Sequence, residues 1–159
     1  MHRHMKVVFA LGIAGLVSVL SVTSVFADKV YHSERLDLTL TPAGASTGHP
    51  ALRHGQVVNI HPNGPIVAAI EKYMVSGAKA QTAYALWLHL QADGCDGAPL
   101  FSIETATIET DRAGNGHADV TFTPDDLAGL SGATVGASWT LRSGGTDAYA
   151  TVCTTVVLD

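Results

Sequence analysis

Apolar and polar residues alternate along much of this chain. Leucine occupies every second position from Leu36 to Leu40, and the apolar residues of 82–91 also fall largely on one parity. Side chains of a β-strand point alternately to the two faces of its sheet, so this period of two predicts half-buried strands. Residues 82–91 are the best candidate for a central strand. Strands are predicted over 34–41, 56–60, 82–91, 100–110, 118–122, 134–141 and 148–158.

Residues 66–75 fit two patterns. Their apolar positions match helical spacing behind a candidate cap at Asn63, and in that helix Glu71 and Lys72 lie on the exposed side. However, the helix would be short and surrounded by strands, and Tyr73 to Val75 are residues typical of strands. We favour a strand, with the helix as the alternative.

Turn-forming residues separate these segments. The stretch 42–55 is predicted as a loop, 61–65 as a turn, and 111–116 and 142–147 as hairpin connections. Thr123 followed by Pro124 and two aspartates is typical of a helix start, so one or two helical turns are predicted over 124–130. Seven or eight short strands with turns about every ten residues indicate an all-β sandwich or barrel.

The first 27 residues have the pattern of a signal peptide. Arg3 and Lys6 precede a long uncharged apolar run, and Val25 and Ala27 are the small residues expected before a cleavage site. We expect cleavage after Ala27, which leaves a single domain over 28–159. The alternative is a retained membrane anchor, since the run is about 20 residues long. In the favoured interpretation the protein is exported, and it meets the membrane only through the leader before cleavage.

Removing the leader makes the chain more acidic. Seven of the nine basic residues and all fourteen acidic residues follow Ala27, so the net charge of 28–159 is −7 with histidine neutral. Nucleic acid is therefore not an expected partner.

The two cysteines, Cys95 and Cys153, both follow the leader. Because exported proteins fold where thiols are oxidised, the pair is predicted to form a structural disulfide. Closing this loop of 58 residues would stabilise the fold by about 4 kcal/mol in the chain-entropy model.

Residues 110–123, TDRAGNGHADVTFT, resemble the turn-and-strand signature of secreted bacterial immunoglobulin-like modules. Residues 76–86 are similar to a strand entry found in small exported bacterial proteins. The resemblance implies an immunoglobulin-like antiparallel β-sandwich and no particular activity. No cysteine precedes Trp87, which departs from the order of cysteines and tryptophan in antibody domains.

Histidine is the one enriched residue type with metal-binding chemistry. His49, His54 and His61 fall in predicted loops, where they form a candidate copper or zinc site if the loops converge. Their spacings of five and seven residues match no compact ligand motif, so solvated histidines are the favoured interpretation, with no cofactor. His89 and His117 are expected on strand faces, partly exposed.

Other motifs point to chemistry only weakly. Ser76 to Lys79 matches the Ser-x-x-Lys pattern of penicillin-binding enzymes, but the accompanying motifs are missing. Asp93, Asp96, Asp111 and Asn115 lack the spacing of a calcium loop and are interpreted as turn residues. The sequence identifies no catalytic residue.

The aromatic residues support a further alternative. Tyr73, Tyr84, Trp87, Trp139 and Tyr149 are interpreted mainly as core, but Trp87 or Trp139 is a candidate sugar-stacking platform. We therefore expect an exported, non-enzymatic domain that binds an extracellular protein or glycan or has a structural role. Long edge strands are candidate sites for pairing with a partner strand. The alternatives are a copper or zinc protein and a carbohydrate-binding module.

Overall fold

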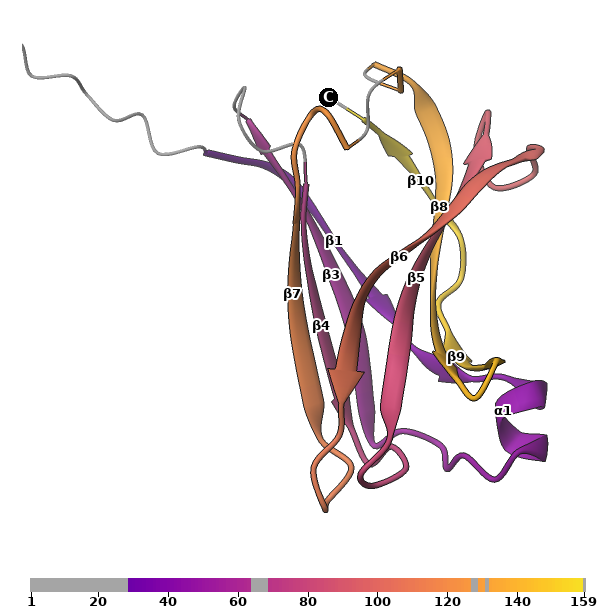
Figure 1. The fold of residues 1–159 in the computed structure, drawn as a ribbon. Helices are drawn as coiled ribbons and strands as arrows, with labels where there is room; N and C mark the ends of the chain where they lie inside the picture. Colours follow the sequence, from indigo (N-terminus) through magenta and orange to yellow (C-terminus); the bar gives the residue numbers. More distant parts are fainter. Residues whose placement is uncertain (1–28, 64–68, 127–128, 131, 159) are drawn as a thin grey trace, which may run out of the picture.

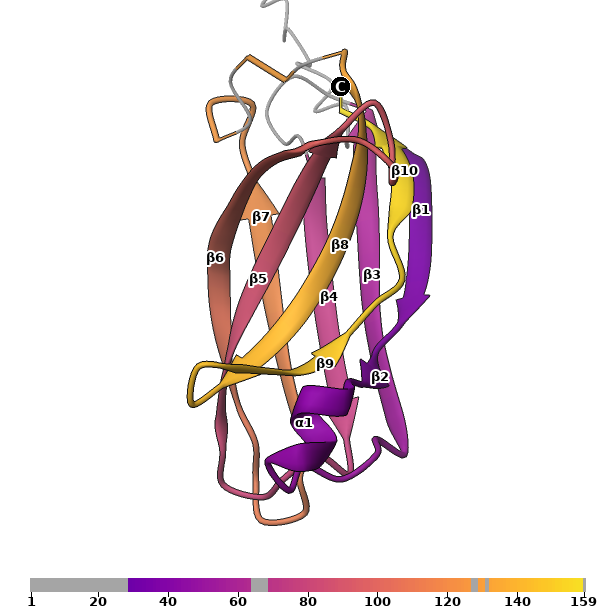
Figure 2. The same ribbon diagram turned by 90° about the vertical axis from the view of Figure 1, so that its right-hand side faces the viewer.

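The computed structural model describes residues 29–63, 69–126, 129–130 and 132–158. The predicted signal peptide lies outside these residues. Two antiparallel sheets pack face to face as a β-sandwich, which confirms the predicted all-β class (Figures 1 and 2). No helix in the described part is both long and apolar enough to cross a bilayer.

The smaller sheet has four strands. Its spatial order is β1 (Lys29–Asp37), β3 (His54–Asn63), β4 (Ala69–Ser76) and β7 (Gly116–Phe122). The segment 66–75 is thus strand from Ala69 onward, as favoured from the sequence, while 64–68 lie outside the described residues. Alternate residues of β4 are buried, and Glu71 is among them.

The larger sheet has β5 as an interior strand, as predicted. Its order is β2 (Thr39–Leu40), β9 (Thr146–Ala150), β8 (Thr134–Ser143), β5 (Ala83–Ala92) and β6 (Pro99–Glu109), with β10 (Thr154–Val157) also pairing with β8. The alternation in β5 holds throughout, because Tyr84, Leu86, Leu88 and Leu90 are all buried in the core between the sheets.

A short helix, α1 (Pro42–Ser46), lies where a loop was predicted. Thr41 caps it by accepting a hydrogen bond from the Gly44 N–H, and Pro42 occupies the first turn. A side chain at Gly44 would collide with the Ala148 carbonyl of β9, so glycine allows this close packing. The helical turns predicted over 124–130 differ: residues 124–126 form a turn capped by Asp126, and 127–128 lie outside the described residues.

Two predicted strands are each divided in two. After β1 the chain leaves the smaller sheet at Leu38, and β2 pairs with β9 in the larger sheet. The predicted strand 148–158 is interrupted at 151–153. There the Thr151 hydroxyl accepts a hydrogen bond from the backbone N–H of Trp139. These breaks explain why the described strands outnumber the predicted ones.

The two predicted hairpins have different outcomes. Gly144 and Gly145, both at positive φ, join β8 to β9 in a tight hairpin, as predicted. The turn at 111–116 instead carries the chain from β6 in the larger sheet to β7 in the smaller one, so it is not a hairpin connection.

The predicted disulfide is confirmed. Cys95 in the β5–β6 loop bonds to Cys153 between β9 and β10, with 5.7 Å between the two Cα atoms. The bond holds β10 beside the loop at that end of the larger sheet.

Candidate functional site

The structure does not bring the three candidate metal ligands together. His54 and His61 belong to β3 rather than to loops, and their offset of seven positions along the strand separates them by about 23 Å. Their side chains also differ in placement, since His54 is exposed and His61 is buried. Across the described residues, no group of three or more His, Cys, Asp or Glu side chains is arranged to hold a metal ion.

His49 lies after α1 in a cluster with two tyrosines. Its backbone N–H donates to the Gly44 carbonyl, and its Nδ1 is 2.9 Å from the Tyr84 hydroxyl. The Tyr84 and Tyr149 rings pack 5.6 Å apart, and the Tyr149 hydroxyl donates to the Pro50 carbonyl. Burial, with the nearby Lys79 charge, lowers the pKa of His49. The imidazole therefore serves as a neutral packing element.

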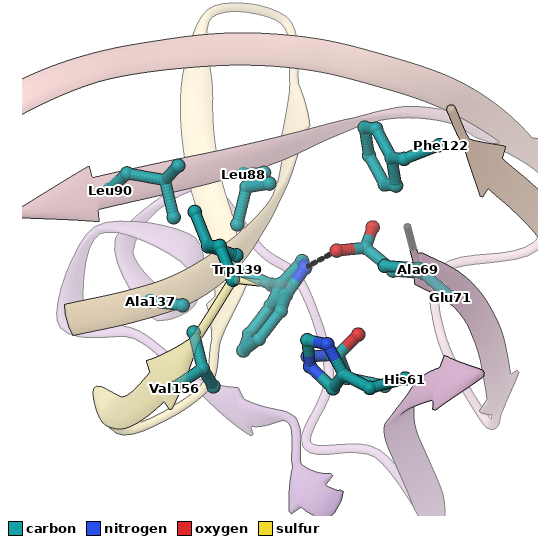
Figure 3. A pocket seen from close by; sticks show the side chains of 11 residues that line it. His61, Ala69, Glu71, Leu88, Leu90, Phe122, Ala137, Trp139 and Val156 are labelled. Carbon is teal, nitrogen blue, oxygen red and sulfur yellow. Dashed lines mark hydrogen bonds between the residues drawn. The ribbon is translucent and has the colours of Figure 1, made fainter. Parts of the chain in front are cut away.

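The core contains a polar cluster that spans both sheets (Figure 3). Glu71 on β4 is only 2% exposed, and one of its oxygens accepts a 2.7 Å hydrogen bond from Trp139 Nε1 on β8 of the opposite sheet. The Tyr73 hydroxyl donates to its other oxygen. On β3, Asn59 Nδ2 donates to His61 Nε2 at 2.9 Å. A cavity of about 20 Å³ lies among Asn59, His61, Glu71 and Trp139, with apolar walls elsewhere.

Burial dominates the electrostatics of this cluster. It raises the pKa of Glu71 to about 7, although the donors Tyr73 and Trp139 favour the carboxylate and lower it. Burial and the adjacent Glu71 charge also raise the pKa of Tyr73 far above its usual value, so its hydroxyl stays protonated. Glu71 thus titrates near neutral pH inside the sandwich.

The outer face of the larger sheet carries a second group of polar and aromatic side chains. Trp87 on β5 is half-buried, and the Arg142 guanidinium of β8 lies 4.9 Å from the centre of its ring. Arg142 Nε also donates to Asp147 at 2.8 Å. In register, Trp87 is flanked by Glu104 on β6 and Thr140 on β8.

His89 lies on the same face, half-buried as expected, while His117 on β7 is exposed. His89 Nδ1 is 2.7 Å from Ser102 Oγ, and Nε2 is 2.9 Å from Thr140 Oγ1. This resembles the serine and histidine of a Ser-His-Asp triad, but the group in the third position is the Thr140 hydroxyl instead of a carboxylate. A hydroxyl does not stabilise an imidazolium as a carboxylate does. Burial also lowers the pKa of His89.

The edge strand β6 exposes apolar side chains. Phe101 and Ile103 are paired with core residues Leu90 and Leu88, so they face the core side, yet they are 38% and 40% exposed. Register shifts in the β5–β6 ladder occur beside both pairs. Bulges and proline, here Pro99, are features that hinder strand addition at a sheet edge. These features work against the addition of a partner strand at the β6 edge.

The residues considered for a calcium site and for the Ser-x-x-Lys motif include two with structural roles, Asp111 and Ser76. Asp111 accepts hydrogen bonds from the Ala113 and Asn115 N–H groups, which lowers its pKa and caps the turn. A surface depression of about 510 Å³ beside it includes Glu109 and His117, but Asp111 there is already engaged by its own turn. The Ser76 hydroxyl, at the end of β4, donates a hydrogen bond to Asn115 Oδ1.

Most of the tyrosine and tryptophan residues considered for sugar stacking lie in the core, as the sequence analysis favoured, and one lies at the surface. Trp139 is only 1% exposed, and the three tyrosines named above are fully buried, so none forms a surface platform. Of the two indoles, Trp87 alone reaches the surface. Comparisons with protein-family models, with curated proteins and with solved structures gave no match.

Sequence reasoning missed Glu71 and Asn59. Glu71 was discoverable from parity: Ala69, Glu71, Tyr73 and Val75 alternate with polar or less buried residues, so a strand over 66–75 already places Glu71 on the apolar face. The helical alternative put Glu71 on the exposed side, and the structure contradicts it. What reveals Glu71 is therefore the choice of a strand period over a helical period for 66–75, because a glutamate by itself does not indicate burial.

Proposed function

We propose that this protein is an exported, non-enzymatic binding domain that contacts carbohydrate through the outer face of its larger sheet, around Trp87. The observation that carries the proposal is the setting of that indole. Its ring is partly exposed on a sheet face, with Arg142 over it and Glu104 and Thr140 beside it. The part of the indole that Arg142 does not cover can make apolar contact with a sugar ring, and the flanking groups can form hydrogen bonds to its hydroxyls.

Export is supported by two independent features. The leader over 1–27 has the charge and apolar pattern of a signal peptide. The bond between Cys95 and Cys153 is stable where thiols are oxidised, as they are outside the cytoplasm. The ligand is therefore proposed to be a glycan of the cell envelope or the cell exterior.

A binding role fits better than catalysis because the reactive side chains serve the fold. His49 is bonded to Tyr84, and His89 is held on both ring nitrogens by hydroxyls. The cavity beside Glu71 has room for about one water molecule, which is too small for an organic substrate.

A glycan is favoured over a protein strand as the partner. The outer face of the larger sheet presents polar groups of both charges around one aromatic ring. The β6 edge, one of the sheet edges where a partner strand could pair, is interrupted by bulges.

The test is retention of the purified protein on insoluble peptidoglycan, chitin and cellulose. We expect the wild type to bind at least one of them and Trp87→Ala to weaken that binding about tenfold, the loss expected for one stacked ring. The matched control is His117→Ala, on the outer face of the other sheet, which should bind like the wild type. The proposal would be contradicted if the wild type binds none of the three polymers, or if Trp87→Ala and His117→Ala bind equally well.

We also infer that the sandwich has immunoglobulin-like connectivity. In chain order, β3, β4, β5, β6, β7, β8 and β9 occupy the positions of strands A, B, C, C′, E, F and G, with β1 added beside A. Cross-strand NMR contacts between β4 and β7 test this order, because those strands are distant in sequence. Pairing of β4 with another strand would contradict it.

A further inference from the structure

The Glu71 carboxyl group is enclosed between the two sheets. It receives one hydrogen bond from its own strand, from Tyr73, and one from the opposite sheet, from Trp139. The second bond is a direct polar link across the core (Figure 3). Any change in the charge of Glu71 therefore acts on the contact between the sheets.

We propose that Glu71 is a proton-operated switch in the core: when protonated it leaves the two sheets tightly packed, and when ionised it draws water to the cavity and loosens their contact. This proposal concerns the rigidity of the domain and is independent of the glycan-binding proposal, since Trp87 lies on the opposite face of the sheet.

The surroundings of Glu71 supply little compensation for a negative charge. The apolar walls of its cavity come from β4, β5, β7, β8 and β10, and among the described residues no Lys or Arg lines it. From β3, His61 faces the cavity, and its Nε2 accepts a hydrogen bond from Asn59 Nδ2. From β1, Glu34 is opposite Asn59 in register and so faces the same side. His32 on β1 is opposite His61 in register.

The cavity offers room for the hydration that ionisation requires. Its volume of about 20 Å³ exceeds what one water needs, roughly 10–15 Å³ on the same kind of measure. Asn59 Oδ1, which lines it, is buried and accepts no hydrogen bond from the described residues. A water there can donate to Asn59 and to the Glu71 carboxylate, which gives both acceptors a donor.

The direction of the effect follows from the pKa of Glu71 in the two states. It is about 4.5 in the unfolded chain and about 7 in the folded protein. Between these values the folded protein keeps a proton that the unfolded chain releases, so stability is greatest below pH 4.5 and falls as the pH rises through 7. Loss of this stabilisation, as the pH rises from below 4.5 to above 7, should increase the unfolding equilibrium constant by about two orders of magnitude.

Trp139 fluorescence provides a direct reading of the switch. The chain has two tryptophans, so Trp87→Phe leaves Trp139 as the only indole. In the disulfide-bonded Trp87→Phe protein, we expect emission to change with a midpoint near pH 7 between pH 5 and 8.5. Urea unfolding should become easier over the same range. Adding Glu71→Gln, which keeps the shape and removes the charge, should abolish both changes.

Two control variants assign the titration to its residue. Glu34→Gln and His61→Gln, each in the Trp87→Phe background, should retain the midpoint within about half a pH unit. If Glu71→Gln retains it, or if His61→Gln alone abolishes it, the proposal is wrong. Should Glu71→Gln fail to fold, the carboxyl ¹³C shift of Glu71 in the wild type decides: titration near pH 7 supports the switch, and titration below pH 5 overturns it.

Discussion

Trp87 and Trp139 lie on neighbouring strands of the same sheet but in opposite environments. Trp139 points into the core, where its N–H bonds to the buried Glu71. Trp87, one residue out of register with it, points outward and packs beneath the Arg142 guanidinium. Each indole thus has one charged partner, a carboxylate inside and a guanidinium at the surface.

The comparison shows that burial decides what a charge does. Water and salt screen Arg142 at the surface, so its ion pair with Asp147 contributes little to stability. Around Glu71 there is little water to screen the charge, so its ionisation is costly and depends on two donors. The same residue type is therefore a buried core side chain at one site and a half-buried surface side chain at the other.

The largest expected difference comes from truncating each indole. Trp139→Ala should lower the free energy of unfolding by about 3–5 kcal/mol, because it opens a large cavity and removes a donor from Glu71. Trp87→Ala should cost about 1 kcal/mol, since its ring is only half-buried. Urea unfolding at pH 6 measures both. Equal losses would show that the two indoles are not distinguished as described.

The disulfide should protect one indole more than the other. Val156 and Leu158, just beyond Cys153, cover the cavity beside Trp139. Replacing both cysteines with alanine should cost about 2–4 kcal/mol and increase acrylamide quenching of Trp139. Quenching of Trp87 should stay unchanged. Variants with a single tryptophan separate the fluorescence of Trp139 from that of Trp87. An equal increase in quenching for both indoles would contradict this placement of β10.

The hydrogen bond from Tyr73 to Glu71 should matter more when the carboxyl is ionised. Tyr73→Phe should raise the pKa of Glu71 further and cost about 1–2 kcal/mol at pH 8.5, with a smaller loss at pH 5. Tyr149→Phe removes a hydroxyl that donates to a backbone carbonyl, so its cost should be the same at both pH values. Urea unfolding of both variants at pH 5 and pH 8.5 measures the loss in free energy of unfolding. Equal pH dependence in the two variants would contradict it.

The smallest effect is expected at the surface. Arg142→Ala should cost less than about 1 kcal/mol, and the cost should shrink further at high salt. Emission from Trp87 should shift to the red as water replaces the guanidinium. A larger cost that does not change with salt would indicate that this pair is shielded like the core cluster.

Local patterns predicted much of the fold. The parity of 82–91 placed β5 correctly because one face of that strand packs on the opposite sheet along its length. The paired glycines at 144–145 predicted their hairpin, since that turn requires two residues at positive φ. The same reasoning failed at Thr41–Pro42, although the cap pattern there matches the one used at Thr123–Pro124. A helix this short depends on its packing against β9, which no local signal reports.

The candidate sites were less accessible to prediction. The three histidines were grouped by their spacing in sequence, whereas β3 extends through two of them and holds them apart. Glu71 was assigned no role from the sequence and was placed only in the helical alternative, on the exposed side. Its burial follows from the strand pattern only when β4 has been chosen over a helix.

By itself, the sequence determined the strand character of most segments, the pairing of its two cysteines and the inward parity of β5. These depend on local periodicity and on a single pair of thiols. Only the tertiary structure decided which sheet each strand joins, and therefore that Glu71 meets Trp139 across the core while Trp87 faces outward. The physical reason is that hydrogen bonds between sheets join residues 68 positions apart. Their geometry depends on how the layers pack, not on any neighbouring residue.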